Sequence, residues 1–70
     1  MAIGFQITLN GEPHKIDGDS CLASLIDQLK LKRGRIAIEI NRSIVPRAQW
    51  DATALKAGDV VEIVNFVGGG

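Results

Sequence analysis

Apolar and polar residues alternate along three separate segments of the chain, a period of two that predicts β-strands with one buried face. In residues 3–9 every second residue is apolar, and the same holds in residues 36–40. Residues 60–67 form a third segment that is more apolar throughout. The side chains expected to face a core are Ile3, Phe5, Ile7, Leu9, Ile36, Ile38, Ile40, Val61 and Ile63.

Two turns follow from the residues between these segments. Asn10-Gly11 is a preferred dipeptide of two-residue hairpin turns, because both turn positions need a positive φ. It predicts a return strand over residues 12–16, where Pro13 favours a sheet edge because proline cannot donate a ladder hydrogen bond. Residues 41–43 turn into a short apolar pair, Ile44-Val45, which Pro46 is expected to end.

One segment has a helical period. Its apolar residues recur at positions i, i+3, i+4 and i+7 and form one stripe: Leu22, Leu25, Ile26 and Leu29. With Ser20 as the N-cap and Gly34 as the stop, they predict a helix of about ten to twelve residues. Residues 47–57 include Trp50 but show no long period, which predicts an irregular stretch with a 3₁₀ turn.

The element order is therefore hairpin, helix, strand, short strand, strand. One helix must pack across a single sheet to bury its stripe, so we expect an α+β fold with a mixed sheet. The first and last strands are both apolar, which favours central, adjacent and parallel positions. This is the β-grasp arrangement of ubiquitin-like proteins. We assign residues 1–67 to that domain and residues 68–70 to a flexible C-terminal glycine tail.

Composition narrows the class of protein. The chain has 70 residues, 46% of them hydrophobic, enough for the core of one small domain. Eight Lys and Arg balance eight Asp and Glu, so no general attraction to nucleic acid or to an anionic membrane is expected. No apolar run approaches the roughly 18–20 residues of a membrane span. No basic and apolar leader begins the chain, and we expect a cytoplasmic protein.

Few side chains offer chemistry of their own. A single cysteine, Cys21, and a single histidine, His14, cannot form an internal disulfide, a cysteine-ligated iron–sulfur cluster or a four-ligand zinc site. We expect His14 to be a packed or solvated strand residue and Cys21 a small side chain at the start of the helix. Asp17 and Asp19 flank a glycine but lack the ligand spacing of a calcium loop, which predicts a turn.

A basic cluster follows the predicted helix and consists of Lys30, Lys32, Arg33 and Arg35. Such a cluster is typical of a solvated helix end, where cations suit the helix dipole, and docking of a partner is the alternative. The side chains thus predict no catalytic residue, no metal site and no bound cofactor in this chain.

The C-terminal residues are different. Gly68-Gly69-Gly70 can extend about 10 Å beyond Val67 and carries a main-chain carboxylate on residues without side chains. Such a peptide can thread a narrow channel in another protein. Ordering it costs very roughly 1–2 kcal/mol per residue, so we expect an apolar docking surface on the domain as well. The period of two places Val64 and Phe66 on the open sheet face, and we predict docking by Val64, Phe66 and Val67.

Three segments carry a resemblance to a known family: FQITLNGE (Phe5–Glu12), NRSIVPRAQW (Asn41–Trp50) and GDVVEIVNFVGGG (Gly58–Gly70). With the leucine stripe of the helix, the whole chain resembles the ThiS family of thiamine-biosynthesis sulfur carriers. A terminal Gly-Gly is shared with other β-grasp proteins, whereas the IVPR…W pattern is the more specific part. Many members of the family end in two glycines rather than three.

The resemblance implies a role as a co-substrate rather than an enzyme. An E1-like, ThiF-like adenylyltransferase would use ATP to join AMP to the Gly70 carboxylate. A sulfur donor system of the cysteine desulfurase type would convert this end to a thiocarboxylate, and a ThiG-like thiazole synthase would take the sulfur for the thiazole ring. In that scheme Gly70 is modified, Gly68 and Gly69 form the tail, and the catalytic groups belong to the partners.

Three other readings stay open at this point. The small subunit of a molybdopterin synthase would carry the same thiocarboxylate to a different acceptor, and the IVPR…W segment argues against it. A ubiquitin-like modifier would be joined to lysines of other proteins. A plain interaction module would have an inert tail.

Overall fold

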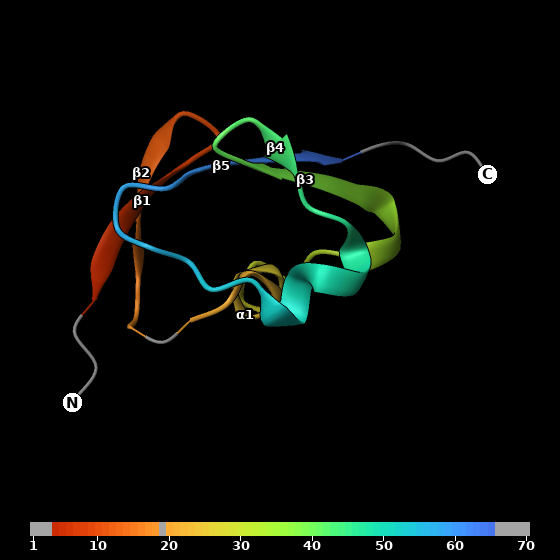
Figure 1. Ribbon diagram of the computed structural model, residues 1–70, viewed down its shortest axis with the longest axis horizontal. Helices are drawn as coiled ribbons and strands as arrows, with labels where there is room; N and C mark the ends of the chain where they lie inside the picture. The colour runs from red at the N-terminus through yellow and green to blue at the C-terminus, as the bar shows by residue number, and fades with distance from the viewer. Residues whose placement is uncertain (1–3, 19, 66–70) are drawn as a thin grey trace.

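The computed structural model describes residues 4–18 and 20–65, and within them the chain forms five β-strands and one α-helix. The elements are β1 (Phe5–Leu9), β2 (Glu12–Ile16), α1 (Leu22–Gln28), η1 (a 3₁₀ turn, Arg33–Arg35), β3 (Ile36–Ile40), β4 (Ser43–Ile44), η2 (a 3₁₀ segment, Arg47–Ala52) and β5 (Val60–Asn65). The strands form one mixed sheet, and α1 and η2 lie on the same side of it (Figure 1). The predicted α+β class is confirmed.

The last strand lies in the middle of the sheet, whose order is β2-β1-β5-β3-β4. β5 runs parallel to β1, with Thr8 aligned to Val60 and Leu9 to Val61, and antiparallel to β3. The predicted parallel contact between the first and last strands is therefore confirmed. β2 is an edge strand, as Pro13 requires.

Both hairpins turn through residues with positive φ. Asn10 and Gly11 have φ values of 50° and 84°, and Asn41 and Arg42 have 51° and 71°. Two consecutive positive φ values define the turn type whose twist matches that of paired strands. The first turn was predicted from its Asn-Gly dipeptide, whereas the second places an arginine at a position that glycine usually occupies.

The asparagine of each turn also contacts β5. The Ile63 backbone N–H donates to Asn10 Oδ1 at 2.8 Å, and the Val60 backbone N–H donates to Asn41 Oδ1 at 2.9 Å. Asn41 Nδ2 in turn donates to Asp59 Oδ1 at 3.1 Å. β5 extends beyond the tip of the β1–β2 hairpin, so the backbone of β1 cannot accept a hydrogen bond from the Ile63 N–H. The Asn10 side chain accepts it instead.

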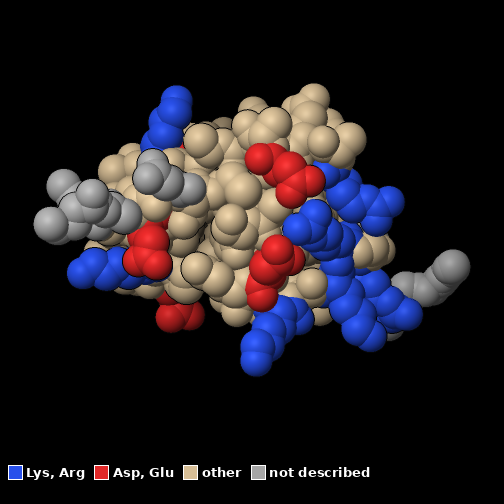
Figure 2. All heavy atoms as spheres, turned by 90° about the horizontal axis from the view of Figure 1, so that it is seen from below, with Lys and Arg blue, Asp and Glu red and all other residues tan. Residues whose placement is uncertain are grey.

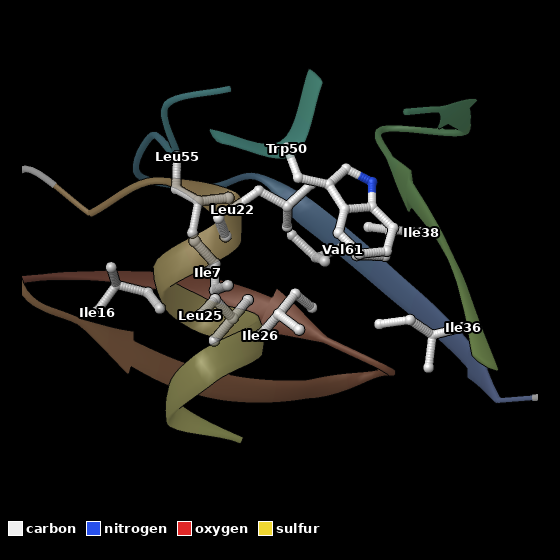
Figure 3. Close-up of a cluster of buried hydrophobic side chains, with 11 residues drawn as sticks. Ile7, Ile16, Leu22, Leu25, Ile26, Ile36, Ile38, Trp50, Leu55 and Val61 are labelled. Atoms are coloured by element: carbon white, nitrogen blue, oxygen red, sulfur yellow. The ribbon is translucent and has the colours of Figure 1, made fainter. Parts of the chain in front are cut away.

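The core lies between the sheet and the layer of α1 and η2 (Figure 3). Leu25 and Ile26 of α1 are fully buried against the sheet, where Ile7 and Val61 come from the central pair of strands. Trp50 of η2 is 1% exposed and closes the other end of the core beside Ile38. Its indole Nε1–H donates to the Val45 carbonyl oxygen at 2.9 Å, so the buried donor is satisfied.

The helix begins one residue later than predicted, and Ser20 is not its N-cap. Cys21 holds that position in an extended conformation, because this part of the chain pairs with residues 53–55. The Leu22 N–H donates to the Thr53 carbonyl at 2.8 Å, and the Leu55 N–H donates to the Ser20 carbonyl at 3.2 Å. A tertiary backbone contact therefore fixes the helix start, rather than a capping side chain.

The helix is also shorter than predicted, with seven residues, and Gly34 is not its stop. Lys30 takes a left-handed conformation with φ of 58°, and its N–H donates to the Asp27 carbonyl at 3.1 Å. The Leu31 N–H donates to the Ile26 carbonyl at 3.2 Å, which completes a Schellman motif. Lys30, directly after the C-cap Leu29, thus takes the left-handed position at which glycine is the usual choice, and Gly34 lies in η1 instead.

Smaller differences concern the strand limits. The short strand covers Ser43–Ile44 rather than Ile44-Val45, and the predicted 3₁₀ turn is confirmed as η2. The predicted extension of the first strand to Ile3, and that of the last strand to residues 66 and 67, fall outside the described residues, as does the tail at 68–70.

The Asn10 side chain provides a test of how the hairpin holds β5. Asn10→Gly keeps the positive φ but removes the acceptor for the Ile63 N–H, and we expect it to lower the free energy of unfolding by about 0.5–1.5 kcal/mol. Asn10→Asp keeps an acceptor oxygen and tolerates the same conformation, so its loss should be smaller. Urea unfolding followed by circular dichroism measures both free energies of unfolding. If Asn10→Gly were as stable as the parent, the Asn10 side chain would not stabilise β5.

Candidate functional site

β5 directs the chain from the middle of the sheet toward the C-terminal residues. Asn65, its last residue, is aligned with Ile36, which directly follows η1. The predicted site residues Phe66, Val67 and Gly68–Gly70 come next and lie outside the described residues. The surroundings of Asn65 are therefore the part of the predicted site that can be described.

The alternation along β5 places Val64 on the face of the sheet opposite α1, as predicted. Val61 is fully buried and Ile63 is half-buried against the core, whereas Glu62 and Val64 are exposed. Val64 leaves 56% of its surface exposed, a large fraction for a valine in a central strand. Its proposed contact with a partner stays a prediction.

Two further apolar side chains share this face, which we call the open face. Ile44 of β4 is 72% exposed and lies opposite Glu39 of β3. Val60, at the start of β5, is 41% exposed. Neither residue was predicted to belong to a surface, although the pairing of Ile44 across its hairpin could have shown that it faces away from the core.

The open face also holds two carboxylates side by side. Glu39 of β3 and Glu62 of β5 are directly opposite each other in the register. Like charges at such a position repel each other weakly, and neither forms an ion pair with the described residues. Apolar side chains around a pair of uncompensated carboxylates suit contact with a surface that supplies a cation.

The other candidate side chains do not form a joint site. His14 lies on the edge strand β2, aligned with Ile7 of β1, and Cys21 lies at the start of α1. Cys21 Sγ lies 3.4 Å from Ser24 Oγ, and this contact is the main cause that lowers the pKa of the thiol below its ordinary value of 9.0. Among residues 4–18 and 20–65, no three His, Cys, Asp or Glu side chains are placed as metal ligands would be.

The last residue of the predicted basic cluster, Arg35, directly precedes Ile36, which is aligned with Asn65 at the end of β5. Figure 2 shows Lys and Arg side chains gathered toward that end. Arg33 contacts two carboxylates, Asp27 at 3.3 Å and Asp51 at 3.8 Å, and these ion pairs tie η1 to α1 and η2. The last turn of α1 carries no basic residue, and Lys30, the first residue of the cluster, directly follows the C-cap Leu29.

No helix in the described part of the chain is long and apolar enough to cross a membrane. The described elements define a ubiquitin-like β-grasp domain with an exposed apolar face beside the strand that leads to the C-terminal glycines. A model of the ThiS family matches residues 7–70, and the chain belongs to this family.

Relatives and a solved structure agree with this assignment. The sulfur carrier protein ThiS of Bacillus subtilis is 32% identical over 65 residues, which cover 91% of this chain and 98% of that protein. The crystal structure of the thiamine biosynthesis protein ThiS from Geobacter metallireducens has 35% identity and a TM-score of 0.80, over 94% of this chain and 100% of that chain.

A thiazole synthase of Magnetococcus marinus is 37% identical over 65 residues, which are 93% of this chain and only 20% of that protein. A second thiazole synthase, from Paramagnetospirillum magneticum, is 32% identical over 65 residues, which are again 93% of this chain and 20% of that protein. This chain thus spans about a fifth of the length of these two proteins. A domain of this type therefore occurs within two longer proteins that bear the name thiazole synthase.

The Ser24 hydroxyl should control the reactivity of Cys21. Ser24→Ala removes the leading cause of the lowered pKa, so the pKa of the thiol rises and less of it is the reactive thiolate at a given pH. We expect the pH profile of alkylation by iodoacetamide to move to higher pH. Ser43→Ala, an exposed serine on β4, is the control, and an unmoved profile in Ser24→Ala would contradict the assignment.

Proposed function

We propose that this chain is a sulfur carrier whose Gly70 carboxylate is adenylated and then converted to a thiocarboxylate, which donates sulfur for thiazole formation in thiamine biosynthesis. The observation that carries the proposal is the family match, which runs through the sheet and includes the C-terminal glycines up to residue 70. The name of the Bacillus subtilis relative, sulfur carrier protein, supports it.

The chemistry explains why a carrier needs an activating partner. A carboxylate resists attack by nucleophiles because it is negatively charged and has no good leaving group. Transfer of AMP from ATP to the Gly70 carboxylate, with release of pyrophosphate, gives an acyl phosphate from which AMP leaves readily. A sulfur nucleophile can then displace AMP, so that sulfur takes the place of one terminal oxygen. The carrier supplies the carboxylate and a docking surface, and the partners supply the catalysis.

Three kinds of partner follow from this scheme: an E1-like, ThiF-like adenylyltransferase, a sulfur donor of the cysteine desulfurase type and a ThiG-like thiazole synthase. The third has additional support, because a domain similar to this chain forms about a fifth of two proteins named thiazole synthase. ATP is consumed by the activating partner, and the proposal assigns no cofactor or metal ion to this chain.

The open face is the proposed docking surface for the activating enzyme. Val64 and Ile44 supply exposed apolar area, and Glu39 and Glu62 between them would pair with a cation of the partner. Phe66 and Val67 would continue this surface toward the tail. An anchor close to the glycines offsets the entropy that is lost when the tail becomes ordered in a channel.

The role of Val64 can be separated from any role in folding. Because Val64 is exposed, Val64→Ala should change the free energy of unfolding by no more than about 0.5 kcal/mol. We expect the same variant to raise the KM for ATP-dependent activation several-fold, and Phe66→Ala to do likewise. Gln28→Ala is the control, since Gln28 is an exposed residue of α1 on the opposite side of the sheet, and its KM should equal that of the parent. Normal activation of folded Val64→Ala and Phe66→Ala would rule out this docking surface.

The position of the terminal carboxylate is the second test. Deletion of Gly70 withdraws it by about 3.5 Å, whereas reacting groups tolerate a misplacement of only about 1 Å before large losses in rate. We expect this deletion and Gly69→Val to leave the melting temperature unchanged and to reduce thiocarboxylate formation at least 100-fold. Purified activating enzyme, sulfur donor and ATP are used, and mass spectrometry detects the exchange of oxygen for sulfur. Loading at the parental rate in both variants would show that Gly70 is not the reactive end.

The intact mass of the protein from sulfur-replete cells distinguishes the proposal from a ubiquitin-like modifier. A terminal oxygen replaced by sulfur is the expected result. An isopeptide link between Gly70 and a lysine of another protein would instead favour the modifier.

A further inference from the structure

A groove of about 290 Å³ opens along the outer side of β3, next to η1 and η2. Its apolar walls come from Ile36 on β3 and from Val45, Pro46 and Trp50 after β4. The residues of the IVPR…W pattern thus form one whole side of the groove. The sulfur chemistry proposed for Gly70 does not require this groove.

The groove exists because β4 is short and the chain then turns away from β3. The Val45 N–H donates to the Ile38 carbonyl at 2.9 Å, but Pro46 has no N–H with which to continue the ladder. The hydrogen bond from Trp50 to the Val45 carbonyl fixes η2 to the end of this segment, after the chain has turned away from β3. The first half of β3 is therefore not covered by β4.

Backbone groups of β3 face into this uncovered edge. Alternate residues of a strand direct their N–H and C=O groups to opposite edges, so those of Ile36 face the same side as those of Ile38. Ile36 also lines the groove. Ile36 is only 6% exposed, but its N–H and C=O are directed to the side of β3 on which the groove lies, so an added extended peptide could pair with them.

The charged residues that line the groove are both arginines, Arg33 and Arg47. Arg33 is already shared between Asp27 and Asp51, which offsets its charge. Arg47 has no carboxylate within 4.0 Å among the described residues, and its guanidinium lies close to Gly34, 3.6 Å from the place where a Cβ atom would stand. The mouth of the groove therefore carries one uncompensated cation.

We propose that this groove binds an extended segment of a partner protein that carries an aliphatic side chain next to a carboxylate. The aliphatic side chain packs between Pro46 and Trp50, the peptide backbone pairs with Ile36, and the carboxylate pairs with Arg47. A phosphate or nucleotide would use the arginine but neither the apolar walls nor the strand edge.

The place of the groove indicates which partner it serves. Ile36 lines the groove and is also aligned with Asn65, the last described residue before the C-terminal segment. A protein that holds this groove therefore lies beside the exit of β5. On the basis of the proposed function, we assign the acidic segment to the enzyme that activates Gly70.

A peptide titration tests the groove without any partner enzyme. The probe is a blocked pentapeptide in which glutamate alternates with leucine and valine, and the control peptide has lysine in place of each glutamate. Trp50 is the single tryptophan, so its indole N–H gives one assignable NMR signal inside the groove. We expect the acidic peptide to shift this signal and the Ile36 amide signal, and the basic peptide to shift neither. Equal shifts with both peptides, no shift at Trp50, or displacement of the acidic peptide by pyrophosphate would overturn the proposal.

Charge reversal gives the matched pair of variants. Arg47→Glu should weaken binding of the acidic peptide about tenfold or more, the loss expected for one charge-assisted contact. Lys15→Glu changes the net charge equally on β2, at the opposite edge of the sheet, and should bind like the parent. A native-like Trp50 signal in the free Arg47→Glu variant shows that it is folded. Equal affinity of the two variants would overturn the proposal.

The activating enzyme provides the second readout. If the parent protein is not activated at all, the proposed function fails, whatever the peptide shows. If the parent and Lys15→Glu are activated with the same KM and Arg47→Glu shows a KM about tenfold higher, the groove contacts that enzyme. If the parent is activated normally and Arg47→Glu has the same KM as the parent, the segment does not belong to the activating enzyme. The binding of an acidic peptide by the groove is judged separately by the titration.

Discussion

The position of β5 between β1 and β3 is the constraint on which the rest of the structure depends. Without it, the two hairpins would share no hydrogen bonds, since β1 and β3 do not pair with each other. Val61 brings a fully buried side chain to the centre of the core, and the turn residues Asn10 and Asn41 each accept a hydrogen bond from the β5 backbone. The same strand carries Val64 outward and ends at Asn65. The element that unites the fold thus also positions the proposed reactive end.

Much of this arrangement follows from local patterns in the sequence. Alternation of apolar residues predicted the strands and their buried faces, and Asn10-Gly11 predicted the first hairpin turn. The helix ends could not be predicted in this way, because tertiary contacts decide them. Pairing of residues 20–22 with residues 53–55 displaces Ser20 from the cap position, and a Schellman motif places Lys30 where a glycine was expected. Neither contact leaves a signal in a short window of sequence.

The candidate site was predicted only in part for a related reason. The alternation of side chains along β5 is enough to place Val64 on the open face. Ile44 is placed there by the register of the β3–β4 hairpin, which the sequence pattern does not give. The groove depends on three segments that meet only in the folded chain, namely η1, the uncovered half of β3 and the segment from β4 to η2. The IVPR…W pattern could be recognised as specific to a family, but its physical role requires the hydrogen bond between Trp50 and Val45.

The central position of β5 has a consequence for biosynthesis. Ribosomes make β1 and β3 well before β5, and contacts between distant segments of a chain form slowly because the intervening loop must close first. A nascent chain that stops before residue 60 has two hairpins with open edges and lacks the buried Val61. Such a fragment cannot assemble this sheet and remains a substrate for proteases and chaperones. Every folded molecule in the cell therefore already contains β5, the strand that leads to the proposed reactive end.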